Sequence, residues 1–165
     1  MATVDIQFNA NALQAALTNG APLTIVEGDN VDVYVRAFDY TTEEYVLGKF
    51  VVPSNVVAGS VVFSSAVIME TPASGEVARQ RFSHIALEDG EDFDVAYANE
   101  LLGATALNYT VDQDDITIME WSETIANLGW QAGDLILFKV SRPYSIESPD
   151  IGDLYLLHFT IKIPV

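Results

Sequence analysis

The sequence has no cysteine and few basic residues, and these two shortages exclude several classes of protein. Without cysteine, the 165-residue chain can form no disulfide and has no thiolate that could bind a metal or act as a nucleophile. Lysine and arginine number 7 against 24 acidic residues, which gives a net charge of −17. The stretch from Phe82 to Phe138 contains no lysine or arginine. Nucleic acids and anionic membrane surfaces bind proteins through clustered cations, so we expect neither as a partner.

Long hydrophobic runs are also missing. No stretch of about 18 consecutive apolar residues occurs, so we expect no membrane-spanning helix, and the first residues lack the pattern of a signal peptide. Motifs of catalysis are absent too, because there is no Gly-x-Ser-x-Gly elbow and no Gly-rich phosphate loop. A chain this acidic always offers pairs of carboxylates, so such pairs indicate nothing specific. We therefore predict that the protein is not an enzyme.

Half of the residues are hydrophobic, and they gather in short runs separated by turn residues. Val31–Phe38 alternates, which places Val31, Val33, Val35 and Ala37 on one face of a strand. Runs of this kind, rich in Val, Ile, Tyr and Phe, are typical of strands, and eight of them are most economically buried in a sandwich or closed barrel. The other seven predicted strands span 45–52, 60–70, 76–87, 104–111, 115–121, 134–141 and 153–163.

Two short segments are predicted to be helical. Residues 11–17 are good helix formers, and residues 122–129 offer Ser122 as an N-cap and Gly129 as a C-terminal stop. Residues 1–30 precede the strand series and include a candidate strand over 3–8. Such an arm has too few neighbours in the sequence to bury itself, so we expect it to fold over the domain or to pack on another chain.

The histidines and tryptophans are the side chains most often found in sites. His84 and His158 each lie in a strand pattern between apolar residues, and a zinc site would need carboxylates to complete it, so we expect them to pack or to face solvent. Trp121 and Trp130 flank the second predicted helix. Exposed aromatic rings could stack on sugars or anchor a protein interface, whereas buried ones would pack in the core.

Five carboxylates cluster at the turn that follows the fourth predicted strand. Calcium prefers several hard oxygen ligands, so this turn is a candidate cation site, although its spacing departs from that of an EF-hand. The alternative is a hydrated acidic turn. Apart from Ca²⁺ at this turn, we expect no cofactor. The candidate residues are Glu88, Asp89, Glu91, Asp92 and Asp94.

Four segments, taken in order, resemble the small jelly-roll structural proteins of tailed bacteriophages. The first is a strand–turn–strand that ends in Pro53, the second begins a strand after Gly59, and the third is an acidic turn after a strand. The fourth is the C-terminal third, where Gly-Asp opens a strand that ends in Arg and a second strand follows two Asp residues. The segments are 37–53, 56–63, 85–94 and 130–164.

The resemblance covers about residues 31–164 and implies an eight-stranded antiparallel jelly-roll β-sandwich. It implies a homotrimer on the virion, made in the host cytoplasm, that decorates the capsid by binding the major capsid protein lattice. A tail appendage or a carbohydrate-binding, receptor-recognising module is the alternative. Residues 1–30 match no part of this pattern, so the predicted organisation is an arm over 1–30 and a jelly-roll domain over 31–165.

The C-terminal segment also predicts an ion pair. Arg142 ends one strand, and Asp150 and Asp153 begin the region of the next. An Arg–carboxylate pair across the intervening loop would close the two strands into a hairpin. The alternative is that Arg142 extends along the surface with its guanidinium in water.

Overall fold

The computed structural model describes residues 2–27, 29, 31–39, 41–70, 77–92, 94, 96–106, 115–143 and 152–165, and for 77–78 and 98–106 only the backbone. In these ranges the chain forms eleven strands and one short helix. The strands are β1 (Thr3–Asn9), β2 (Gln14–Ala15), β3 (Leu23–Glu27), β4 (Asp32–Phe38), β5 (Glu44–Val51), β6 (Ser60–Met69), β7 (Val77–Leu87), β8 (Ala98–Ala106), β9 (Thr117–Thr124), β10 (Leu135–Arg142) and β11 (Leu154–Pro164), and the helix is α1 (Ile125–Leu128).

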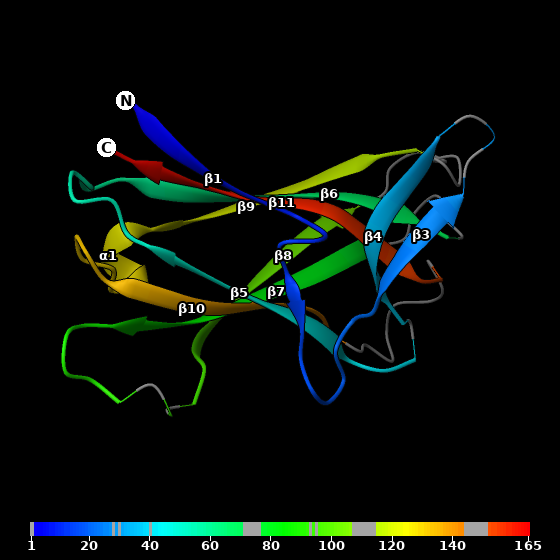
Figure 1. Cartoon of the computed structure of the whole chain (residues 1–165). Helices are drawn as coiled ribbons and strands as arrows, with labels where there is room; N and C mark the ends of the chain where they lie inside the picture. Colours follow the sequence, from blue (N-terminus) through cyan, green and yellow to red (C-terminus); the bar gives the residue numbers. More distant parts are fainter. Residues whose placement is uncertain are drawn as a thin grey trace.

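The strands form two antiparallel sheets that stack face to face (Figure 1). One sheet has the order β3-β4-β11-β6-β9, with β1 also paired to β11, and the other has the order β2-β5-β10-β7-β8. The eight strands from β4 onward are divided between the sheets as β4-β11-β6-β9 and β5-β10-β7-β8, which is the order of a jelly roll. The predicted fold class, an all-β jelly-roll sandwich with an N-terminal extension, is confirmed.

The eight predicted strands correspond to β4–β11, and seven of them begin and end within about three residues of the prediction. The exception is β8, which begins at Ala98 although the run at 104–111 predicted it six residues later; residues 107–111 of that prediction lie outside the described residues. β8 pairs with β7 over most of the length of β7, from Val77 to His84. This long antiparallel partner sets the position of β8, and periodicity in the sequence cannot report it.

The N-terminal segment folds over the domain. β1 pairs with β11 along its whole length, from Thr3 opposite Pro164 to Asn9 opposite His158, and the two chain ends lie together (Figure 1). β2 then pairs with β5 on the other sheet, and β3 returns to pair with β4. Leu13 is fully buried in the core between these pairings. Residues 3–27 therefore contribute strands to both sheets.

Arg36 fixes this segment to β4. Arg36 is 8% exposed, and its guanidinium donates from Nε to the carbonyl of Ala10 at 2.9 Å, from Nη1 to that of Ala21 at 3.3 Å and from Nη2 to that of Leu13. Burial lowers the pKa of Arg36. These three carbonyls lie outside the strands that pair in the sheets. The planar guanidinium of Arg36 therefore supplies hydrogen-bond donors to three carbonyl groups where the chain bends.

The helix predicted over 11–17 is wrong. The backbone N–H of Ala12 instead donates to the carbonyl of Asn9 at 3.0 Å and to its side-chain Oδ1 at 2.9 Å, which makes a turn. The chain then enters β2 with Leu13 buried. Strand pairing and burial of Leu13 outweigh a weak local preference for helix.

The second predicted helix is present but shorter. Its N-cap is Thr124, whose Oγ1 accepts the N–H of Asn127 at 3.2 Å, whereas Ser122 lies in β9 and does not cap it. The helix ends at Gly129 with a φ of 69°, as predicted. No helix in the described ranges is long and apolar enough to cross a membrane.

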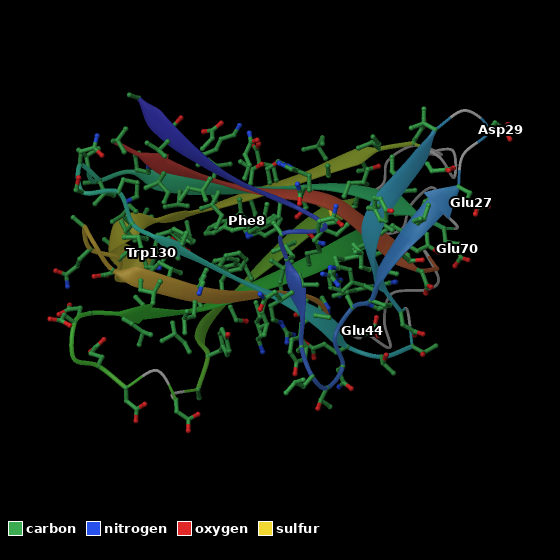
Figure 2. The ribbon with its side chains drawn as sticks, in the orientation of Figure 1. Phe8, Glu27, Asp29, Glu44, Glu70 and Trp130 are labelled. Carbon is green, nitrogen blue, oxygen red and sulfur yellow. The ribbon has the colours of Figure 1, made fainter. Side chains whose placement is uncertain are left out.

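Aromatic rings form the centre of the core. Phe82 is completely buried and packs on Phe63 at a centroid distance of 4.5 Å, on Phe138 at 5.4 Å and on Phe159 at 5.9 Å. Figure 2 shows Phe8 and Trp130 in the space between the two sheets. Opposite Phe138 stands Gly48, where a Cβ would lie 2.2 Å from the ring, so the packing of this ring requires glycine.

Candidate functional site

A groove of about 570 Å³ lies beside β5, where the outer face of the five-stranded sheet meets β1 and the turn before β2. This volume is within the range of about 300–1,000 Å³ that small-molecule sites occupy. The lining residues come from β1, β2, β5, β10 and the segment before β8. They are Gln7, Phe8, Ala12, Gln14, Leu47, Gly48, Lys49, Tyr97 and Leu137.

The floor of the groove follows from the alternation of β5. Val46 and Phe50 are buried in the core, so Leu47 and Lys49 point to the opposite, outer face. Leu137 on β10 is the register partner of Lys49 and faces the same way. The floor thus combines two half-buried leucines with one exposed ammonium group.

Tyr97 forms one wall. Its ring centroid lies 5.5 Å from Nζ of Lys139, and the ring of Tyr45 lies 5.7 Å from the same ammonium group. Burial and, to a smaller extent, the neighbouring Tyr45 raise the pKa of Tyr97. At neutral pH Tyr97 is therefore a protonated phenol, which can donate and accept a hydrogen bond beside an aromatic face.

The other side of the groove carries two amide groups. Gln7 on β1 and Gln14 on β2 are both exposed and both line the cavity. An amide offers two N–H donors and one carbonyl acceptor. The groove can therefore hold a ligand that has one flat apolar face and several hydroxyl groups.

The lining described by the structure contains no Asp or Glu, although the chain has 24 of them. The charged side chain in this lining is that of Lys49. Farther along the same face, Glu43 accepts from Nη1 of Arg81 at 3.2 Å and from the hydroxyl of Ser141 at 3.1 Å. The described lining of the groove is therefore free of the excess negative charge of the chain.

Arg142 is held by backbone groups. Its Nη1 donates to the carbonyls of Gly152 and Phe38, the latter at 3.4 Å, which ties the end of β10 to the chain entering β11. Burial lowers the pKa of Arg142, and the charges of Asp153 and then Asp39 oppose that effect. Asp150 lies outside the described residues. The pairing of Arg142 with a carboxylate stays a prediction.

Three of the five carboxylates of the acidic turn accept hydrogen bonds from protein groups. Glu91 accepts the N–H of Glu88 at 2.9 Å, and Asp92 accepts that of Asp94 at 2.9 Å. Oε1 of Glu88 accepts from the amide of Gln131 at 2.8 Å. Among the described residues no three acids or histidines gather in a way that could hold a metal. The calcium site therefore gains no support from this geometry and stays a prediction.

The histidines and tryptophans mostly pack. His84 is 1% exposed and Trp130 is 3% exposed, and their rings meet edge to face at 5.4 Å. Trp121 is half-buried and stacks on Phe63 at 5.8 Å. His158 is half-buried, with Nδ1 3.1 Å from the Thr160 hydroxyl. Neither tryptophan lines a described cavity: Trp130 is buried in the core and Trp121 stacks on a core ring.

The sequence did not single out the groove. Gln7 and Gln14 lie in the segment that matched no pattern, and Tyr97 was one of several tyrosines. The alternation of 45–52 places Lys49 and the apolar Phe50 on opposite faces of the strand, and so predicts that Lys49 faces outward. The strand order, which brings these four side chains together, is the information that was missing.

No protein-family model and no curated protein matches the sequence of this chain. Its fold is similar to part of the Arthrobacter globiformis T6 isomalto-dextranase in complex with panose, with a TM-score of 0.58 and 13% identity over 95% of this chain. The chain spans 23% of that enzyme. It is also similar to the CBM22-2 xylan-binding domain of Paenibacillus barcinonensis Xyn10C, with a TM-score of 0.52 and 14% identity over 96% of this chain and 98% of that domain. At these identities the similarity shows a shared jelly-roll fold.

Proposed function

We propose that this chain is a non-catalytic carbohydrate-binding domain and that the groove beside β5 is its binding site. The observation that carries the proposal is the combination of groups in one concave site. The aromatic face of Tyr97, the amides of Gln7 and Gln14 and the apolar floor of Leu47 and Leu137 line the same cavity. Sugar rings have apolar faces and hydroxyl rims, which these two kinds of surface complement.

The similar structures support this proposal at the level of the fold. One is titled a xylan-binding domain, and this chain covers nearly all of it. The other is an isomalto-dextranase, as its name states, and its structure was solved in complex with panose. A fold by itself does not determine function, so the groove carries the argument and the fold agrees with it.

A glycan array followed by titration calorimetry tests the proposal. We expect the full chain to bind at least one class of oligosaccharide and Tyr97→Ala to weaken that binding about tenfold, which corresponds to about 1.4 kcal/mol. Tyr34→Ala is the matched control, because Tyr34 is 57% exposed on β4 and does not line the groove. Thermal melting of both variants shows whether each is folded.

Two results would count against the groove. If no glycan binds to the folded chain, carbohydrate binding is excluded for the glycans on the array. If Tyr34→Ala weakens binding and Tyr97→Ala does not, the site lies on the β3–β4 hairpin and not in the groove.

A virion structural role is the second candidate, and exposed apolar side chains favour it. Ile25 and Tyr34 are register partners on β3 and β4, and Leu23 lies on the same face; these side chains are 46%, 57% and 43% exposed. A protein partner, such as another copy in the predicted trimer or the capsid lattice, would cover them. Light scattering gives the oligomeric state, and a monomer that is absent from purified virions would contradict this candidate.

A further inference from the structure

We infer that the groove binds an acidic glycan, one whose sugars carry carboxylates such as uronic acids. This inference rests on the proposed carbohydrate-binding function and specifies its ligand. The juxtaposition that carries it is an aromatic ring and two amides around an exposed lysine, in a lining without carboxylates, on a chain that is otherwise strongly acidic.

Lys49 is the central residue. Its side chain is exposed at the floor of the groove, and no carboxylate of the described residues lies within salt-bridge distance of it. With 24 acids and 7 bases on the chain, a lysine could readily find an internal partner. An ammonium group without a carboxylate beside it attracts an anionic ligand without first breaking an ion pair.

Lys139 extends this positive surface. It lies two residues after Leu137 on β10, on the same face of the strand, and its Nζ lies over the rings of Tyr45 and Tyr97. The two rings orient this ammonium group through cation–π contacts without neutralising it. Lys139 does not itself line the groove, but it adds positive charge beside the Tyr97 wall.

Several acidic side chains lie away from the groove. Figure 2 shows Glu27, Asp29 and Glu70 at the end of the molecule formed by β3 and β4, whereas Phe8, which lines the groove, lies toward the middle. At physiological ionic strength, charges separated by more than about 8 Å are largely screened from each other. The charge nearest a bound ligand, that of Lys49 in the lining, therefore acts on it most strongly.

The chemistry of a uronic acid fits each wall. Its carboxylate accepts hydrogen bonds from the Lys49 ammonium group, its hydroxyls pair with the amides of Gln7 and Gln14, and its ring stacks on Tyr97. Methyl esterification removes the charge of such a sugar and keeps its ring, its hydroxyls and its linkage. An acid and its ester are therefore a matched pair of ligands.

The experiment measures affinities by calorimetry in calcium-free buffer. The probes are oligomers of galacturonic, glucuronic and mannuronic acid, each beside its methyl ester, with a neutral xylan oligomer for comparison. We expect one acid to bind at least tenfold more tightly than its ester, and Lys49→Gln to remove that difference. Lys162→Gln on β11 of the other sheet is the matched control and should leave the preference unchanged.

Each outcome separates this inference from the proposed function. Three results would contradict the inference that the ligand is acidic and would still agree with carbohydrate binding. They are equal affinity for the acid and its ester, higher affinity for a neutral glycan, and a preference for the acid that Lys49→Gln does not reduce. If no acid, ester or neutral glycan binds to the folded chain, the proposed function fails together with the inference.

Discussion

The imidazole of His84 lies within the core and has one hydrogen bond. Because the carbonyl of Leu128 can only accept, Nε2 of His84 carries the proton and donates to it at 3.1 Å. Burial lowers the pKa of His84, and the hydrogen bond to Leu128 opposes that effect with a smaller influence. The folded state therefore favours the neutral ring more strongly than the unfolded chain does.

This preference makes stability depend on pH. Above the unfolded pKa of about 6.5 both states hold His84 neutral, so the folded state loses nothing. As the pH falls below that value, the unfolded chain takes up a proton that the folded chain refuses, and the free energy of unfolding decreases by at most about 1.4 kcal/mol per pH unit. We expect urea denaturation to show this loss between pH 7.5 and 5.5, and His84→Gln to reduce it.

The second histidine provides the control. His158→Gln is the comparison variant, because it removes the half-buried histidine of β11 and leaves the His84–Leu128 hydrogen bond in place. A loss of the same size in all three proteins would show that groups other than His84 cause it.

At the scale of elements, local alternation predicted individual strands well. The run 31–38 predicts a strand, and β4 over Asp32–Phe38 is present. Its burial does not follow the alternation strictly, because Val31 is 69% exposed whereas Arg36 and Phe38 on the other face are buried. Alternation reports only which residues of a strand share a face, so it also indicates that Lys49 faces outward. It carries no information about which strands are neighbours, and for that reason the groove between β1, β5 and Tyr97 could not be predicted.

The N-terminal segment was the least predictable part of the fold. Residues 11–17 contain alanine and leucine at helix-forming density, yet their backbone turns and pairs with β5. Arg36 satisfies three of the carbonyls in this segment from a distant position in the sequence. Interactions of this kind depend on tertiary structure, and local propensity does not report them.

β1 is the element whose contribution to stability can be measured most directly. Phe8 packs on Phe138 at a centroid distance of 5.0 Å, whereas Val4 on the same strand is 37% exposed. We expect Phe8→Ala to lower the free energy of unfolding by about 2–4 kcal/mol through the lost packing. Val4→Ala should change it by less than about 0.5 kcal/mol. Equal, small effects would mean that β1 is a detachable arm and not part of the core.

At the scale of the whole molecule, the main feature is the imbalance of charge. A net charge of −17 on 165 residues opposes the compact state by self-repulsion. Part of this repulsion is local, because Glu27 on β3 stands directly opposite Asp32 on β4. Like charges in register across two strands destabilise the pair.

Salt should therefore stabilise this protein. Raising sodium chloride from 10 to 200 mM shortens the screening length from about 30 Å to less than 10 Å, which weakens repulsion across the molecule. We expect a gain on the order of 1 kcal/mol, which for a domain of this size raises Tm by roughly 2–4 °C in a thermal scan. Glu27→Gln should be more stable than the unmodified chain in low salt and should gain less from added salt. A Tm that does not change with salt would show that the carboxylates of this chain are already neutralised, by bound cations or by internal partners, and would direct attention back to the acidic turn at residues 88–94.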